Sequence, residues 1–212
     1  MQLIGMLDSP YVRRVAVSLQ LLGLPFEHRS ISVFRTFEQF QQINPVVKAP
    51  SLICDDGEVL MDSTLIIEYA EGLAAAGKSL MPQDAAGRQH ALRTIGLAMA
   101  ACEKTVQIVY ERDLRPAEKS YQPWVTRVTG QLLAAYDALE NEMRLRPLAA
   151  TSDAMNQAGI STAIAWHCTW EKIPDLLKPA DYPLLHAFSA QAELLPAFKA
   201  APYGDGVYPV RP

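Results

Sequence analysis

The chain has 212 residues, half of them apolar, and a formal net charge of −4. This length allows one large or two small domains, and the apolar fraction suffices for a buried core. A weakly acidic chain without a basic run is not expected to bind nucleic acid or an anionic membrane. No apolar stretch reaches the length of a membrane span, and residues 1–7 lack the basic start of a signal peptide.

The cysteines and histidines give no sign of a cross-link or a metal site. Cys54, Cys102 and Cys168 are far apart, odd in number and in no CxxC spacing. This pattern is typical of a reduced, cytoplasmic setting and argues against a disulfide scaffold or a zinc site. The four histidines show no spacing suited to metal ligands, so we expect no metal.

The first two elements are a strand and a helix. Residues 2–7 form a short apolar strand pattern, and Pro10 directly after Ser9 marks a helix start. Apolar residues define one face of this helix, and we expect Arg13 and Arg14 to lie off that face. Gly23 and Pro25 then end the helix.

The next elements build a small sheet. A second strand is expected at 26–32 and a short, irregular helix at 36–43. Two apolar runs, 51–54 and 59–61, flank the turn signal Asp55-Asp56-Gly57 and therefore predict a β-hairpin. Pro50 cannot donate to a strand ladder, and a cis Ala49-Pro50 bond is plausible at this turn.

Asp62-Ser63 opens the helical segment that follows the hairpin. A helix N-terminus offers unpaired N–H groups and a partial positive charge, which together with the Ser63 hydroxyl suit a carboxylate. The Asp62 carboxylate beside it suits an ammonium. An anion site next to an acid is the chemistry that an α-amino acid headgroup needs.

After Asp84 only helical patterns remain. Long helices are expected at 85–112 and 124–143, and a helix at 161–170 that is apolar nearly all round is expected to be buried. A further helix covers 182–195, and the Pro- and Gly-containing tail from Pro196 is expected to be irregular. The predicted fold class is α/β plus all-α, with a thioredoxin-like N-terminal domain followed by a C-terminal helical domain.

The segments NPVVKAPSL and DGEVLMDSTLIIEY resemble the glutathione-binding half of the cytosolic glutathione transferase family. The start, LIGMLDSPYVRRV, is similar to the first strand, catalytic loop and first helix of its serine-type members. The resemblance implies a glutathione-binding domain at 1–77, a linker at 78–84 and a helical domain at 85–212 that supplies a hydrophobic pocket. It also implies a cytoplasmic homodimeric transferase of the detoxification type, with glutathione as co-substrate and a small hydrophobic electrophile as partner.

The resemblance assigns roles to particular residues. It makes Ser9 the group that stabilises the glutathione thiolate, the form of the thiol that acts as a nucleophile. Lys48 matches a position that contacts the glycine end of glutathione, Ala49 a position whose backbone pairs with the cysteinyl part, and Asp62-Ser63 the pair that holds the γ-glutamyl group. From the residues alone, Ser9 and Ser63 are equally helix caps and Lys48 a solvated lysine. Possible walls of the electrophile pocket are Leu7, Tyr11, Tyr110 and Trp166.

Two departures and three alternatives complete the sequence-based hypothesis. Ser161 is followed by Ile164 where the family often has an acidic capping partner, and no cysteine lies near Ser9, which disfavours thiol exchange and dehydroascorbate reduction. The alternatives are a glutathione-fold binding or regulatory protein without turnover, and a narrow glutathione-dependent isomerase, dehalogenase or ether-cleaving enzyme. A disulfide reductase is opposed by the lack of a CxxC motif at Ser9 to Val12.

Overall fold

The computed structural model describes residues 1–207, which form two compact units. The first unit comprises Met1–Leu80 and the segment that begins at Leu194; the second comprises Met81–Glu193. The sequence-based division had assigned everything from 85 to 212 to the helical domain. The segment after Leu194 instead packs within the first unit, and residues 208–212 of the expected domain lie outside the described part.

The first unit is built on a mixed sheet in which the described residues form four strands. They are β1 (Gln2–Ile4), β2 (Glu27–Arg29), β3 (Ser51–Ile53) and β4 (Val59–Met61), in the order β2-β1-β3-β4. Strand β1 is parallel to β2 and antiparallel to β3, and β3 pairs antiparallel with β4. This is the expected thioredoxin-like layout, with a βαβ unit first and a hairpin second.

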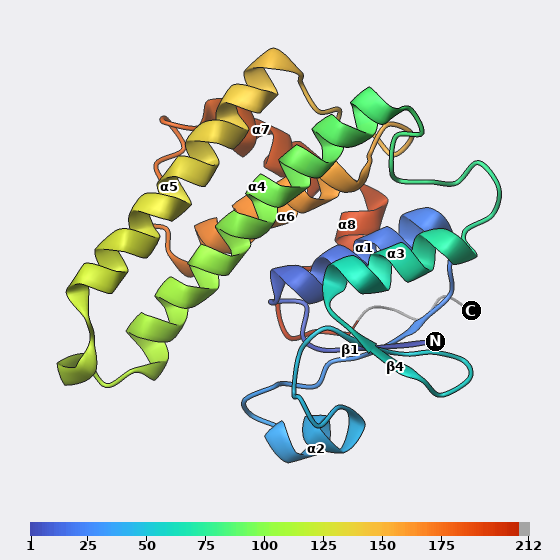
Figure 1. The fold of residues 1–212 in the computed structure, drawn as a ribbon, viewed down its shortest axis with the longest axis horizontal. Helices are drawn as coiled ribbons and strands as arrows, with labels where there is room; N and C mark the ends of the chain where they lie inside the picture. Colours follow the sequence, from blue (N-terminus) through green and yellow to red (C-terminus); the bar gives the residue numbers. More distant parts are fainter. Residues whose placement is uncertain (208–212) are drawn as a thin grey trace. The chain divides into compact units, whose positions relative to one another are not determined.

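The helices of this unit lie on both sides of the sheet, as Figure 1 shows: α1 (Pro10–Leu22) and α3 (Ser63–Leu73) on one side, α2 (Phe37–Ile43) on the other. Helix α1 begins with Pro10 in its first turn and ends at Gly23, whose φ of 75° is left-handed. Glycine adopts this conformation without steric cost, which explains why the helix stops there.

Two features of this unit go beyond what the sequence indicates. Arg13 and Arg14, which the sequence places off the apolar face of α1, are nonetheless buried, each with 1% of its surface exposed. The Arg13 Nε donates to the Ala201 carbonyl at 2.7 Å, and its guanidinium lies 5.8 Å from the Phe198 ring centre. The segment from Pro196 is not wholly irregular, because Pro196–Ala200 forms the short helix α8, with proline in its first turn.

The second unit consists of helices within the described residues. These are α4 (Ala85–Val109), a π-helical turn η1 (Tyr110–Leu114), a 3₁₀ turn η2 (Ala117–Lys119), α5 (Gln122–Leu145), α6 (Gln157–Lys172) and α7 (Pro183–Ala192). Helix α6 begins four residues before the expected Ser161, because the Asn156 side chain caps it by accepting from the Gly159 N–H at 3.0 Å. This cap replaces the capping box that Ser161 and Ile164 cannot form.

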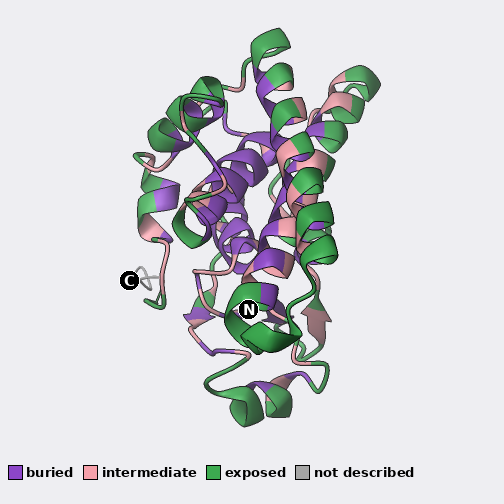
Figure 2. Ribbon diagram, turned by 90° about the vertical axis from the view of Figure 1, so that its left-hand side faces the viewer, coloured by how far each residue is buried: buried purple, intermediate pink, exposed green. Residues whose placement is uncertain are grey.

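Helix α6 is the core of the second unit, as its apolar sequence predicts. Its residues from Gln157 to Trp166 are all buried, and Figure 2 shows buried residues gathered in the middle of the bundle. The hydroxyl groups here bond within the unit: Tyr136 donates to the Ala165 carbonyl at 2.9 Å and lies 2.6 Å from the Thr169 Oγ1. Trp166 has edge-on ring contacts with Tyr136 and Tyr182.

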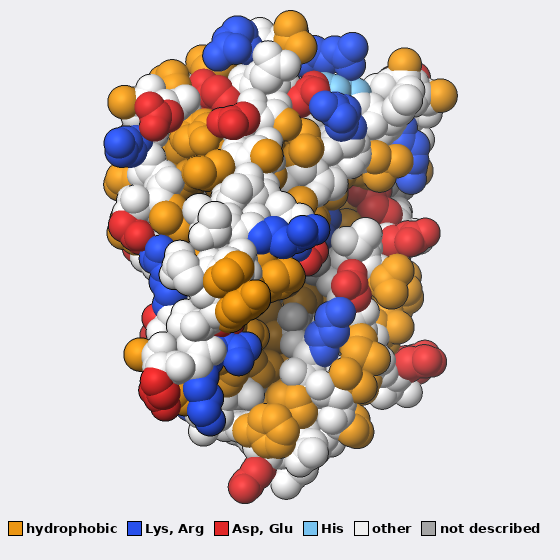
Figure 3. Space-filling model, turned by 60° about the vertical axis from the view of Figure 1, so that its left-hand side comes forward, with side chains coloured by type: hydrophobic (Ala, Val, Ile, Leu, Met, Phe, Trp, Pro, Cys, Tyr) orange, Lys and Arg blue, Asp and Glu red, His pale blue; other side chains and the backbone are white. Residues whose placement is uncertain are grey.

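Charges of both signs are interspersed on the face drawn in Figure 3, in keeping with the small net charge. Across residues 1–207, no helix is long and apolar enough to cross a membrane. In the same part of the chain, no group of three or more His, Cys, Asp or Glu side chains is arranged to hold a metal ion. Cys54, Cys102 and Cys168 are buried and unbridged.

Candidate functional site

The residues singled out in the first unit converge where two helices begin. Ser9 is the N-cap of α1, and Asp62 is the N-cap of α3. Arg14 of α1 reaches the first turn of α3, where its Nη1 donates to the Ser63 Oγ at 3.1 Å. A buried arginine in the second turn of α1 therefore contacts the start of α3, and each of the two helices carries unpaired N–H groups and partial positive charge at its N-terminus.

Ser9 has the geometry of a helix cap, and its hydroxyl group can still donate a hydrogen bond. Its Oγ accepts from the Val12 N–H at 3.4 Å, a long hydrogen bond that uses one lone pair. Among residues 1–207, no acceptor for the hydroxyl hydrogen of Ser9 is found. The hydroxyl can thus cap α1 and donate to a ligand at the same time.

The loop that carries Lys48 and Ala49 is organised by a buried asparagine. The Asn44 Oδ1 accepts from the Val46 N–H at 3.0 Å, and its Nδ2 donates to the Ser51 Oγ at 2.8 Å. The Ser51 hydroxyl in turn donates to the Lys48 carbonyl at 2.8 Å. The Ala49-Pro50 bond is cis, as the sequence suggested.

Gly5 allows this loop to approach the start of α1. A Cβ atom at Gly5 would lie 2.6 Å from the Val12 Cγ2 and 3.2 Å from the Ala49 Cβ, and the glycine has a φ of +134°. Both the space and the backbone conformation therefore favour glycine. The close packing places Ala49 beside the first turn of α1, which Ser9 caps.

Asp62 and Ser63 form the second part of the site. Asp62 has a φ of 76°, an uncommon conformation for a residue other than glycine, and its Oδ1 accepts from the Thr64 N–H at 2.9 Å. Ser63 is buried with 4% of its surface exposed, yet no acceptor takes its hydroxyl hydrogen within residues 1–207. Backbone strain of this kind is found preferentially at functional sites.

Lys48 reaches Asp62 across the end of the hairpin. Its Nζ lies 3.5 Å from the Asp62 Oδ2, and the two side chains are 51% and 42% exposed. An ion pair as exposed as this contributes only about 0–1 kcal/mol, so either charge can exchange its partner for a ligand at small cost.

Sequence reasoning missed two residues that support the site. The sequence places Arg14 only off the apolar face of α1, and no local signal marks its role, since its partners Ser63 and Thr64 are 49 and 50 residues away. His28 is also buried, and its Nε2 lies 2.7 Å from the Gly5 carbonyl oxygen. Burial lowers the pKa of His28, and the hydrogen bond with the Gly5 carbonyl opposes that decrease.

The candidate pocket residues lie in different surroundings. Leu7 is fully buried in the first unit, and Tyr11 is half-buried on the first turn of α1. In the second unit, Tyr110 is 45% exposed at the π-helical turn after α4, while Trp166 is 2% exposed within the bundle core. Their role as pocket walls stays a prediction, and the burial of Leu7 and Trp166 favours packing.

The site combines hydrogen-bond donors, the Asp62 carboxylate and the exposed Lys48 ammonium group. The α3 N-terminus with Ser63 and Arg14 behind it suits a carboxylate, and Asp62 suits an ammonium. Ser9 offers a hydroxyl donor on the neighbouring helix start. These groups suit a ligand with an α-amino acid end and a further group that accepts a hydrogen bond.

Comparison with known proteins shows which family the N-terminal part of the chain resembles. Residues 3–78 match the family described as glutathione S-transferase, N-terminal domain. The uncharacterised GST-like protein YibF of Escherichia coli is 28% identical over 165 residues, covering 78% of this chain and 80% of that protein.

Solved structures extend the likeness to nearly the full chain. A glutathione transferase family member from Pseudomonas fluorescens Pf-5, solved with bound glutathione, has a TM-score of 0.80 and 27% identity, covering 94% of this chain and 97% of its own. A maleyl pyruvate isomerase, a bacterial zeta-class glutathione S-transferase, has a TM-score of 0.70 and 25% identity, covering 95% and 96%. Residues 3–78 therefore form a glutathione S-transferase N-terminal domain, and nearly the whole chain shares the fold of these bacterial glutathione transferases.

Proposed function

We propose that the chain is a glutathione-dependent enzyme in which Ser9 stabilises the glutathione thiolate for attack on a hydrophobic electrophile. The observation that carries this proposal is the pair of serine hydroxyls, Ser9 and Ser63, at two helix starts joined by Arg14. The structural relative from Pseudomonas fluorescens was solved with glutathione, which supports the choice of ligand.

In this proposal the γ-glutamyl end of glutathione binds at the start of α3. Its carboxylate accepts from the Ser63 hydroxyl and the first N–H groups of the helix, with the buried Arg14 guanidinium adding positive potential. Its ammonium pairs with Asp62. Lys48, which now lies 3.5 Å from Asp62, turns to the glycine carboxylate when the ligand supplies Asp62 with a new partner.

The cysteinyl part of glutathione binds between these ends. The backbone of Ala49 pairs with it in an extended conformation, in the way a strand adds to a sheet edge. The sulfur then lies near Ser9, whose hydroxyl donates to the thiolate. A decrease of two units in the thiol pKa corresponds to about 2.7 kcal/mol of preferential thiolate stabilisation, which one charge-assisted hydrogen bond and a helix N-terminus can supply.

A homodimer is supported by an apolar stripe on the first unit. Leu65, Tyr69 and Leu73 follow one another at intervals of four residues along α3 and are 58%, 38% and 46% exposed, and Met61 at the end of the preceding strand β4 is 36% exposed. Residues four apart lie on one helix face, and a stripe of this kind is typical of a buried interface. Sedimentation that finds only monomer at micromolar concentration would exclude this assembly.

A second candidate is a glutathione-dependent isomerase, favoured by the structural likeness to the maleyl pyruvate isomerase. The same thiolate would add to a cis alkene and leave again after rotation, so glutathione would not be consumed. Conversion of maleate to fumarate without loss of thiol would distinguish this activity from transfer. A regulatory protein without turnover is a further alternative, and the absence of any activity on a broad electrophile panel would favour it.

The experiment that tests the proposal is a pH titration of the ultraviolet thiolate absorbance of bound glutathione. We expect the wild-type protein to lower the thiol pKa and Ser9→Ala to remove most of the shift without preventing binding. The matched control is Ser18→Ala on the same helix, whose hydroxyl donates to the Arg14 carbonyl at 2.7 Å and lies away from the helix start.

The affinity for glutathione is measured in parallel. Asp62→Ala and Ser63→Ala should each weaken binding by about tenfold, which corresponds to about 1.4 kcal/mol. A thiol pKa in Ser9→Ala equal to that in the wild type would contradict the proposed role of Ser9. An unchanged affinity for glutathione in both Asp62→Ala and Ser63→Ala would contradict the proposed binding site.

A further inference from the structure

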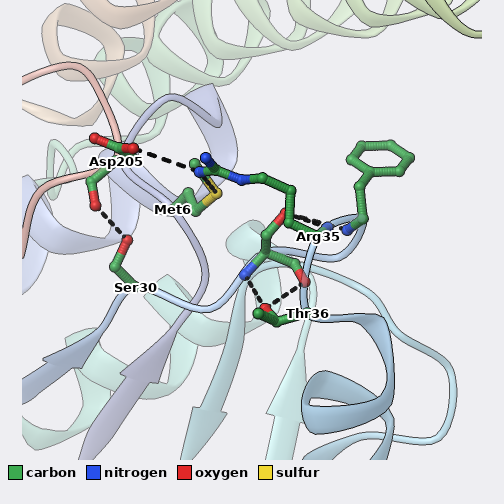
Figure 4. A network of polar contacts seen from close by, with 7 residues as sticks. Met6, Ser30, Arg35, Thr36 and Asp205 are labelled. Carbon is green, nitrogen blue, oxygen red and sulfur yellow. Dashed lines mark hydrogen bonds and ion pairs between the residues drawn. The ribbon is translucent and has the colours of Figure 1, made fainter.

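The loop between β2 and α2 holds an arginine over the chain segment that leads to Ser9. The Arg35 Nη2 lies 3.6 Å from the Met6 Sδ and 3.4 Å from the Asp205 Oδ2, and Figure 4 shows its side chain extended between these two partners. Its backbone N–H donates to the Ser32 Oγ at 3.0 Å. The base of Arg35 is thus fixed while 66% of its side chain remains exposed.

Met6 connects this arginine to the thiol end of the proposed site. The Ser9 N–H donates to the Met6 carbonyl at 3.1 Å, so Met6 and Ser9 are the two ends of one turn. A cation that rests on the Met6 side chain therefore lies beside the turn that presents the Ser9 hydroxyl. Lys48, on the other hand, lies on the hairpin side of the unit, where it contacts Asp62.

In this structure Arg35 pairs with a carboxylate of the same chain, and the contact between the two side chains is weak. Asp205 is 71% exposed, and its contact with Arg35 is at the long end of the hydrogen-bond range. The backbone carbonyl of Asp205 accepts from the Ser30 Oγ at 2.7 Å, which brings the C-terminal segment to this loop (Figure 4). Exposed pairs of this kind contribute little, and a guanidinium binds a planar carboxylate with two parallel bonds.

We propose that Arg35 is a specificity-determining residue that selects an electrophile carrying a carboxylate, with Asp205 as the internal group that such a substrate displaces. This inference rests on the proposed function and names the substrate class of the same site. The carboxylate belongs to the electrophile rather than to the glycine end of glutathione, because Arg35 contacts the turn of Ser9 and Lys48 is available for the glycine end.

A matched pair of alkenes separates the effect of a substrate carboxylate on the rate from the other properties of the substrate. Monoethyl fumarate and diethyl fumarate are both activated by an ester, and only the first carries a negative charge. In both, the thiolate sulfur forms a bond to one alkene carbon, the π electrons move to the carbon next to the ester, and water supplies the proton there. The ratio of kcat/KM for the monoester to that for the diester measures the selection.

We expect Arg35→Met to lower this ratio by about tenfold, the value of one charge-assisted hydrogen bond, and to leave the diester rate unchanged. Asp205→Asn should raise the ratio, because the substrate no longer competes with the internal carboxylate. Arg29→Met is the matched control: it removes the same charge from the same unit, and the Arg29 guanidinium contacts Gln2 instead of Met6. It should leave the ratio unchanged.

The outcomes separate this inference from the proposed function. Conjugation of both esters by the wild type, with a ratio that Arg35→Met does not change, overturns the role of Arg35 and leaves the thiolate chemistry intact. An equal loss for both esters, together with a higher KM for glutathione, would assign Arg35 to the glycine carboxylate and also overturn it. A wild-type protein that conjugates neither ester and does not shift the thiol pKa overturns both proposals.

Discussion

The two units of this protein treat their buried polar groups differently. In the helical unit, the hydroxyls of Thr105 and Thr169 lie within hydrogen-bond distance of carbonyls one turn earlier on their own helices, and their oxygens are 2.7 Å apart. The Glu140 carboxylate likewise accepts from the Leu184 and Leu185 N–H groups at the start of α7. These groups satisfy one another, so their role is structural.

In the first unit the polar groups have hydrogen-bonding capacity left over. Ser9 and Ser63 accept hydrogen bonds and keep their hydroxyl hydrogens for another partner, and Asp62 and Lys48 share only an exposed ion pair. A buried polar group without its full set of partners costs free energy, and proteins retain such groups where a ligand completes them. The helical unit has its own exceptions in Gln107 and Thr162, whose buried Oε1 and Oγ1 atoms have no hydrogen-bond partner within the described residues.

The largest effect should come from Arg14, the link between the two helix starts. Arg14→Met leaves the hydroxyls of Ser63 and Thr64 without their donor and should destabilise the protein by about 3 kcal/mol. It should also weaken glutathione binding by at least about tenfold. Chemical denaturation and calorimetric titration with glutathione measure the two effects.

Arg13 supplies the control for this experiment. It is as buried as Arg14, but its side chain bonds to the Ala201 carbonyl after α8 instead of to Ser63. Arg13→Met should therefore lower stability and leave the affinity of the folded protein for glutathione unchanged. If the two variants bind glutathione equally well, Arg14 is only a packing residue and the contrast between the units is weakened.

An intermediate effect is expected for Tyr136 in the helical unit. Tyr136→Phe removes the hydroxyl that bonds to the Ala165 carbonyl and to Thr169, so the free energy of unfolding should fall by about 1–2 kcal/mol. The thiol pKa of bound glutathione should not change. A variant that alters this pKa would show that the network of the helical unit takes part in the chemistry.

The smallest effect is expected from the titration of His28. Burial lowers its pKa below that of the unfolded chain, so the folded protein resists protonation and the unfolded chain does not. The stabilisation is present above the unfolded value of about 6.5 and is lost as the pH falls from there through the folded pKa. The effect is small because the hydrogen bond with the Gly5 carbonyl opposes the shift.

Thermal denaturation between neutral and mildly acidic pH tests the direction in which His28 makes stability change with pH. The wild type should lose stability as the pH falls, and His28→Gln should lose less across the same interval. A wild type whose stability rises as the pH falls would mean that the folded protein favours the protonated imidazole, contrary to the burial of this side chain.

Local signals in the sequence determined most of the secondary structure. Pro10 and Gly23 mark the ends of α1, and Asp55-Asp56-Gly57 predicts the turn between β3 and β4. Proline narrows the range of backbone conformations and glycine widens it, whatever the rest of the fold. The same locality made Ser9 and Asp62-Ser63 recognisable as helix starts. These features depend on neighbours within a few residues of the chain.

Tertiary structure alone decided which charges are buried and what they touch. The partners of Arg14 and Arg13 lie 49 and 188 residues away, so no local pattern could show that these arginines are covered. The contact of Lys48 with Asp62 and that of Arg35 with Asp205 have the same origin. Helix periodicity tells which side of a helix is apolar, but only the packing of distant segments determines whether the opposite side meets water or another part of the protein.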